Sequence, residues 1–134
     1  MKLIDQLHPV DVIVAKKKSG LSRVLDHYIV YLGKGVFIGN LKGCVKIIPH
    51  QELDELLRDY EPVRIRRFSG NNFDVQKAIQ RAYQRLGQKY SYLGFNCEHY
   101  ANWVQYGKEK SNQVNAGLAI LGGILFLRMM SNDE

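Results

Sequence analysis

The chain has 134 residues, of which 46% are hydrophobic and 24% are charged, and its net charge is +6. This length excludes two domains of ordinary size, and the composition excludes extended disorder. The cationic residues are spread along the chain instead of forming a basic and aromatic stripe, which argues against a nucleic-acid binder. We therefore expect one globular domain that binds no nucleic acid.

The sequence contains two cysteines, Cys44 and Cys97, without the spacing of metal ligands. No apolar secretory segment follows Lys2. Small secreted scaffolds normally use more cysteines than this. We expect free thiols in the reducing cytoplasm, with no bound metal and no cofactor.

Alternating and β-branched residues predict strands in the first half of the chain, with a tight hairpin around Lys34. One short helix is predicted with Pro49 in its first turn. The strand at 62–68 is expected to have one wet face, with Val63 and Ile65 on the other. The predicted strands are 11–17, 27–33, 35–39, 44–49 and 62–68, and the predicted short helix is 49–57.

Helical spacing of apolar residues replaces alternation after residue 70. One helix is predicted to begin after a cap at Asn72 and to end near Gly87, and a second to run from a cap at Asn96 to Gly107. The expected fold class is α+β: a small antiparallel sheet packed on helices that lie together on one side.

Cys97 is the first residue of the second predicted helix. Unsatisfied backbone N–H groups and the positive end of the helix dipole at this point stabilise a thiolate, which is the reactive form of cysteine. The same N–H groups point to where an oxyanion forms when a sulfur attacks a carbonyl. Most lone cysteines are instead small hydrophobes packed between helix and sheet, so position alone leaves both interpretations open.

A reactive cysteine needs a base, and four histidines are candidates. His8 and His50 flank prolines and are expected to be exposed. His99 lies two residues from Cys97 on a helix, so it points away from the sulfur. His27 opens a strand on one face with Ile29 and Tyr31, where a sheet can offer an imidazole to a cysteine on a helix packed across it.

Two segments carry a family resemblance. "DHYIVYLGKGVFIGN" at 26–40 and "YSYLGFNCEHYANWVQYG" at 90–107 resemble the H-box and the NC-box of the lecithin retinol acyltransferase-like (LRAT-like) family. The resemblance runs in order from about Asp11 to Gly107, and "NCEHY" is its most specific part.

The resemblance implies a circularly permuted papain-like fold, in which the histidine strand precedes the cysteine helix. It also implies thiol-dependent acyl transfer, in which the cysteine takes an acyl group from a lipid ester as a thioester and passes it to water, an amine or an alcohol. Carried over to this sequence, Cys97 is the nucleophile and the donor of one oxyanion N–H, and His27 is the general base and acid.

The sequence departs from the family pattern at a third position. Vertebrate members carry a second histidine on the return strand of the hairpin, where this chain has Gly39. Glycine cannot orient an imidazole. Asn40 could accept the N–H of His27 if a bulge at Gly39 shifted the register by one. An ordinary hairpin exit fits the two residues equally well, and activity is then weakened, differently tuned or absent.

The tract "NAGLAILGGILFLRMM" has an uncharged core between Asn115 and Arg128, which is shorter than the roughly 20 residues of a spanning helix. The resemblance favours contact with a membrane surface, because family members that act on lipids often carry such an anchor. An interfacial helix, a re-entrant segment or an element packed on a partner subunit are alternatives. We divide the chain into an LRAT-like catalytic domain at 1–113 and a hydrophobic tail at 114–134.

The preferred function is a cysteine-dependent acyltransferase or phospholipase that acts on a lipid acyl ester through Cys97, His27 and Asn40. One alternative is a catalytically silent module that binds a membrane or a protein. A cysteine peptidase or amidase with the same pair of residues is another.

Overall fold

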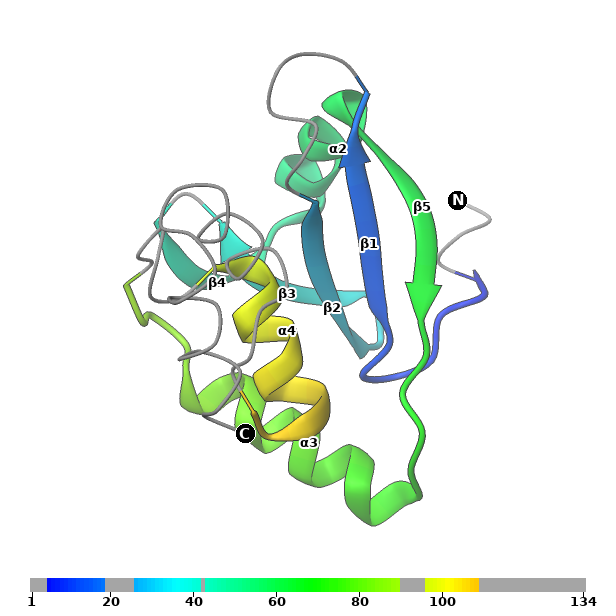
Figure 1. The fold of residues 1–134 in the computed structure, drawn as a ribbon, viewed down its shortest axis with the longest axis vertical. Coiled ribbons are helices and arrows are strands. Elements are labelled where there is room, and N and C mark those ends of the chain that lie inside the picture. The colour runs from blue at the N-terminus through cyan, green and yellow to red at the C-terminus, as the bar shows by residue number, and fades with distance from the viewer. Residues whose placement is uncertain (1–4, 19–25, 42, 90–95, 109–134) are drawn as a thin grey trace, which may run out of the picture.

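The computed structural model describes residues 5–18, 26–41, 43–89 and 96–108. It confirms the α+β class: a five-stranded antiparallel sheet with the strand order β4-β3-β2-β1-β5, packed on helices (Figure 1). The elements in chain order are β1 (Val12–Lys17), β2 (His27–Gly33), β3 (Val36–Leu41), β4 (Cys44–Ile48), α2 (His50–Asp59), β5 (Tyr60–Arg66), α3 (Asn72–Gln84) and α4 (Cys97–Tyr106).

The hairpin between β2 and β3 confirms the tight turn predicted around Lys34. Gly33 pairs with Val36, so Lys34 and Gly35 form a two-residue loop. Both have positive φ, 52° and 76°, as the turn type that matches the twist of a hairpin requires. This turn fixes the register of β2 and β3, and with it the face on which each later residue lies.

The two long helices begin and end at side chains that satisfy their free backbone groups. Asn71, and not Asn72 as predicted, caps α3, and it forms a reciprocal capping box with Asp74. Asn96 caps α4 by accepting the N–H of His99 at 2.9 Å. Gly107 ends α4 in the left-handed conformation, with φ 73°, so both predicted limits of this helix are confirmed.

The strand β5 begins at Tyr60, directly after the last residue of α2 and two residues before the predicted start. It is an edge strand, and Pro62 faces Ala15 of β1 next to a register shift. An edge strand tolerates proline because one side of it needs no donor. Val63, expected on the dry face, is 52% exposed.

The helices cover both faces of the sheet, whereas the sequence predicted them on one side. We call the side packed by α3 and α4 the α4 face and the side packed by α2 the α2 face. Alternate residues of each strand point to opposite faces. Buried strand residues on the α4 face are Val12, Val14, Tyr28, Val30, Leu32, Ile38 and Val45; those on the α2 face are Ile13, Ile29, Tyr31, Phe37, Leu41 and Ile48.

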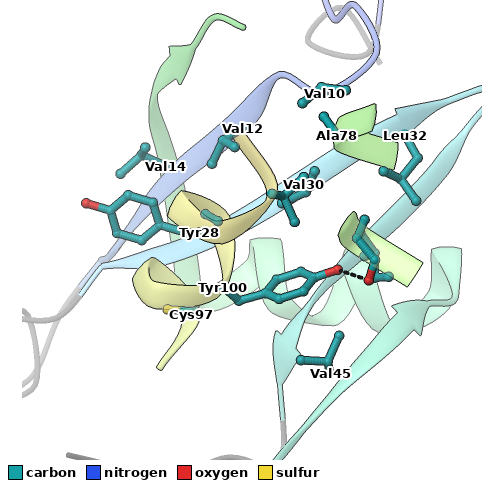
Figure 2. Close-up of a cluster of buried hydrophobic side chains, with 14 residues drawn as sticks. Val10, Val12, Val14, Tyr28, Val30, Leu32, Val45, Ala78, Cys97 and Tyr100 are labelled. Atoms are coloured by element: carbon teal, nitrogen blue, oxygen red, sulfur yellow. Dashed lines mark hydrogen bonds between the residues drawn. The ribbon is translucent and has the colours of Figure 1, made fainter. Parts of the chain in front are cut away.

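Figure 2 shows the core of the α4 face, where Tyr100 reaches from α4 into the layer that also contains Cys97. Its hydroxyl donates a hydrogen bond of 2.8 Å to the carbonyl of Ala82 on α3. Burial of such a ring is a large stabilising contribution, and the hydrogen bond removes the penalty of burying its hydroxyl. The start of α4 is therefore held firmly against the sheet.

Within the described ranges, the helices are too short or too polar to cross a membrane. The apolar tract after Asn115 and the domain boundary predicted at residue 113 lie outside these ranges.

Candidate active site

Cys97 lies at the N-terminus of α4, and its sulfur touches the start of β2. The thiol donates a hydrogen bond of 3.3 Å to the carbonyl oxygen of Asp26. The backbone N–H groups of Tyr28, Cys97 and Glu98 face the sulfur. Because Asp26 and Tyr28 flank His27 in the chain, the sulfur lies against the stretch of backbone that carries the histidine.

Burial decides the protonation state of Cys97. The residue is 7% exposed, and this burial raises the pKa of the thiol to about 11, although the three N–H groups oppose the shift. The adjacent carboxylate of Glu98 raises this pKa further. The thiolate expected from the helix terminus is therefore not the resting form, because desolvation outweighs the N–H groups. A base must take the proton during the reaction.

His27 opens β2, as predicted, but its side chain projects toward the α2 face, whereas Cys97 packs on the α4 face. Its ring meets the ring of Tyr60 edge to face, with centroids 4.4 Å apart and an interplanar angle of 78°. Its Nδ1 is buried without a hydrogen-bond partner among the described residues. No hydrogen bond within the described ranges joins this imidazole to the thiol of Cys97, so their pairing stays a prediction.

The imidazole of His27 is suited to accept a proton. Burial lowers its pKa below the ordinary value, and the positive charge of Lys17 lowers it further. A neutral imidazole at neutral pH is a general base. The site thus holds a protonated thiol and an unprotonated imidazole.

The structure does not support the predicted bulge at Gly39. Gly39 pairs with Ile29 and Asn40 pairs with Val45, and the register runs through both without a shift. A β-carbon at Gly39 would point at Ile48 of the α2 face, with 3.3 Å to its Cδ1. Asn40 is buried and lies on the opposite side, next to Val45 in the α4 layer. It is placed on the side of the sulfur and not on the side of the imidazole.

Of the remaining histidines, His8 and His50 are exposed, as the sequence predicts. The side chain of His8 is 80% exposed. His50 is exposed, and its Nε2 lies 2.8 Å from the carbonyl oxygen of Gly35. His99 is buried, and its backbone N–H takes part in the cap of α4.

A polar network that the sequence analysis did not predict connects α4 to two strands. The hydroxyl of Tyr28 donates a buried hydrogen bond of 3.1 Å to Glu98. The guanidinium of Arg66 lies 5.5 Å from the centre of the Tyr28 ring and donates to Gln105 at 2.7 Å. These contacts join residues far apart in the chain, so no local pattern could have revealed them. They fix Glu98, and hence Cys97, relative to β2.

A cavity of about 290 Å³ opens beside His27 on the α2 face, and its lining residues are His27, Leu41, Glu52, Glu55, Leu56 and Asp59. It gives the imidazole a route to solvent. In the part of the chain that the structure describes, no group of three metal-ligating side chains occurs. The titratable residues of the lining are His27, Glu52, Glu55 and Asp59.

Comparison with known proteins places these residues in a family context. A family model described as Lecithin retinol acyltransferase matches residues 5–110. The Homo sapiens protein named Phospholipase A and acyltransferase 2 is 38% identical over 48 residues, which is 34% of this chain and 30% of that protein. The chain therefore aligns with less than a third of the length of that relative.

Proposed function

The chain belongs to the lecithin retinol acyltransferase family, and from this premise we propose that it is a cysteine-dependent enzyme that transfers or hydrolyses the acyl group of a lipid ester. The observation that carries the proposal is the position of the Cys97 sulfur, which lies at a helix N-terminus and against the backbone on both sides of His27. The name of the human relative supports a phospholipase or acyltransferase class.

The proposed reaction begins with a proton transfer from the thiol of Cys97 to the neutral imidazole of His27. The sulfur attacks the ester carbonyl, and the backbone N–H groups at the start of α4 stabilise the oxyanion. Collapse breaks the bond to the alcohol, which leaves with the proton from the imidazolium and gives a thioester on Cys97. Water or another acceptor then gives its proton to His27 and takes the acyl group, and the thiol re-forms.

In the free protein no hydrogen bond among the described residues joins the thiol to the imidazole, so the proton transfer requires the two groups to approach when substrate binds. Catalytic hydrogen bonds are often long in free enzymes and shorten when substrate binds. The thiol pKa of about 11 means that very little thiolate exists at neutral pH. The rate therefore depends on His27, and removing the imidazole should cost about 10²- to 10⁴-fold.

The test is to incubate the protein with phosphatidylcholine carrying a labelled acyl chain and to search for the acyl adduct by mass spectrometry. We expect an adduct on Cys97 in the wild type, none in Cys97→Ala and a strongly reduced rate in His27→Gln. The matched control is His8→Gln, which changes an exposed histidine and should form the adduct at the wild-type rate. An adduct in Cys97→Ala would exclude the proposed nucleophile.

A catalytically silent module is the second candidate. It is favoured by Gly39, which supplies no side chain to the α2 face, and by the buried, protonated thiol. A folded wild-type protein that forms no adduct with lipid esters or with amide substrates would support this function. Adduct formation from amides alone would instead favour a cysteine peptidase or amidase.

We keep Asn40 as a candidate third member of the site, acting from the α4 layer on the side of the sulfur and not on His27. Replacement by the isosteric leucine removes its polar groups, so Asn40→Leu should lower the rate of adduct formation without removing it. A wild-type rate in a folded Asn40→Leu protein would exclude this role.

We further propose that the catalytic domain at 1–113 works at the cytoplasmic surface of a membrane, to which the tail at 114–134 brings it. The support is the uncharged apolar core of the tail. Flotation with phosphatidylcholine and phosphatidylserine vesicles should be lost when residues after Gln113 are removed. Equal flotation of both proteins would exclude the tail as the anchor.

A further inference from the structure

The proposed general base needs a side chain that orients it, and the hairpin does not supply one. Gly39 has no side chain, and Asn40 lies on the α4 face of the sheet. Among the described residues, the ring of Tyr60 packs against the imidazole of His27, at 4.4 Å between centroids and at an interplanar angle of 78°. Edge-to-face packing of this kind favours one relative orientation of the two rings.

Tyr60 is itself held from two directions. It directly follows α2, and its backbone N–H donates to the carbonyl of Leu56 in the last turn of that helix. It also pairs with Lys17 of β1, and β1 pairs with His27 through Ala15. The phenol ring is therefore carried by backbone that two elements fix, which is what a side chain needs to hold another one in place.

The sulfur lies within electrostatic reach of the same tyrosine. Burial raises the pKa of Tyr60, and the charge of a Cys97 thiolate raises it further, with a smaller contribution from Asp59. Tyr60 thus connects the two proposed catalytic residues, contacting the imidazole directly and responding to the charge on the sulfur.

We propose that Tyr60 is a positioning residue for His27: its ring holds the imidazole in one orientation at the start of β2 and covers the side of the imidazole that it contacts. This inference rests on the proposed acyl transfer and adds to it the group that replaces an orienting side chain at position 39. The ring, and not the hydroxyl, carries the role, because the contact is between ring faces and edges.

The groups around the imidazole determine in which direction loss of the Tyr60 ring shifts the pKa of His27. Lys17 faces it from β1, Tyr60 from β5, and Glu52, Glu55 and Asp59 from α2 around the cavity. Burial is the largest cause of the lowered pKa of His27. Removal of the Tyr60 ring admits water, so this pKa rises and the base becomes protonated at higher pH. The acid limb of the pH profile then moves upward.

The experiment compares Tyr60→Phe, which keeps the ring, with Tyr60→Leu, which removes it. We expect wild-type kcat in Tyr60→Phe. In Tyr60→Leu we expect a kcat about 3- to 10-fold lower at unchanged KM, with the acid limb of kcat/KM at higher pH. Tyr83→Leu makes the same chemical change at an exposed tyrosine of α3 and should leave the rate and both limbs unchanged.

Titration of the His27 ring protons by NMR separates this inference from the proposed function, since it needs no turnover. The pKa of His27 should be higher in Tyr60→Leu than in the wild type and unchanged in Tyr60→Phe. An unchanged His27 pKa in Tyr60→Leu overturns the inference even if the enzyme is active. Should the leucine variant not fold, a wild-type protein without nuclear Overhauser contacts between the Tyr60 and His27 rings overturns it equally. Absence of any turnover with a shifted His27 pKa contradicts the acyl transfer and leaves the ring contact supported.

Discussion

On the α4 face, polar side chains within the core tie the helices to one another and to the sheet. Tyr100 bonds across to α3, Trp103 donates to the carbonyl of Arg81, and Tyr28 donates to Glu98. On the α2 face, the apolar cluster is smaller and a cavity opens beside His27. The proposed nucleophile thus belongs to the firmly packed face and the proposed base to the open one. This division gives precise placement to the sulfur and solvent access to the imidazole.

The largest expected difference between the faces is in stability. Tyr100→Ala, on the α4 face, should cost about 3–5 kcal/mol, since it removes a fully buried ring and its hydrogen bond. Leu53→Ala, on the α2 face, should cost about 2–3 kcal/mol, because the site lies in the smaller cluster. Urea denaturation measures both, with exposed Phe73→Ala as the control near zero. If Leu53→Ala lowered the free energy of unfolding as much as Tyr100→Ala or more, the α4 face would not be the more firmly packed one.

The α4 face should be destabilised at alkaline pH through Cys97. The thiol pKa is about 11 in the folded state and 9.0 ordinarily, so the unfolded state releases the proton first as pH rises. Stability therefore falls between pH 9 and 11, by about 2 kcal/mol at pH 11.

The measurement is the free energy of unfolding of the wild type and of Cys97→Ala from pH 8 to 11. The difference between the two proteins isolates the thiol, because other buried groups such as Tyr28 titrate in both. Parallel curves would show that burial of Cys97 is incomplete in solution.

Protonation of His27 on the α2 face should lower the free energy of unfolding at acid pH, by less than ionisation of Cys97 lowers it at alkaline pH. Burial keeps the folded-state pKa of His27 below its ordinary value of 6.5, so the unfolded state binds a proton first as pH falls. Stability then decreases from pH 6.5 down to the folded-state pKa. His27→Gln should show a flatter dependence than the wild type in the same unfolding experiment. If the variant loses stability as steeply over this range, the pKa of His27 is not lowered in the folded state.

The smallest expected effect is that of Gly39→Ala. Its β-carbon would meet Cδ1 of Ile48 at 3.3 Å and the carbonyl oxygen of Tyr28 at 3.5 Å. The side chain of Ile48 must move slightly, which costs stability, while the loss of glycine from a strand favours folding. The net change in the free energy of unfolding should therefore be below about 1 kcal/mol. Thermal unfolding of the variant measures it. A cost of several kcal/mol would show that the α2 face is packed as tightly as the α4 face at this point.

Local patterns in the sequence predicted most of the elements. The hairpin at Lys34, the Asn96 cap and the Gly107 stop depend on residues within a few positions of each other, and all three are confirmed. The cap of α3 was misplaced by one residue, because Asn71 and Asn72 are adjacent and the capping box with Asp74 decides between them. The start of β5 was placed too late, since Pro62 resembles a strand boundary although an edge strand tolerates it.

The site was predicted less completely than the fold. The sequence does not indicate that the sulfur of Cys97 lies against the backbone on both sides of His27, because the two residues are 70 positions apart in the chain. Their catalytic roles, and that of Asn40, remain predictions. Tyr28, Glu98 and Tyr60 were missed because each acts through a partner at least 33 positions away, as from His27 to Tyr60, which periodicity does not report.

The sequence by itself determined the order of the elements, the caps of α4 and the position of a cysteine at a helix terminus, because short-range geometry governs all of these. The tertiary structure alone decided which face of the sheet each helix covers, and hence that the sulfur is buried with a raised pKa while the imidazole meets Tyr60. Burial and charge depend on every neighbour in space, and neighbours in space are not neighbours in the chain.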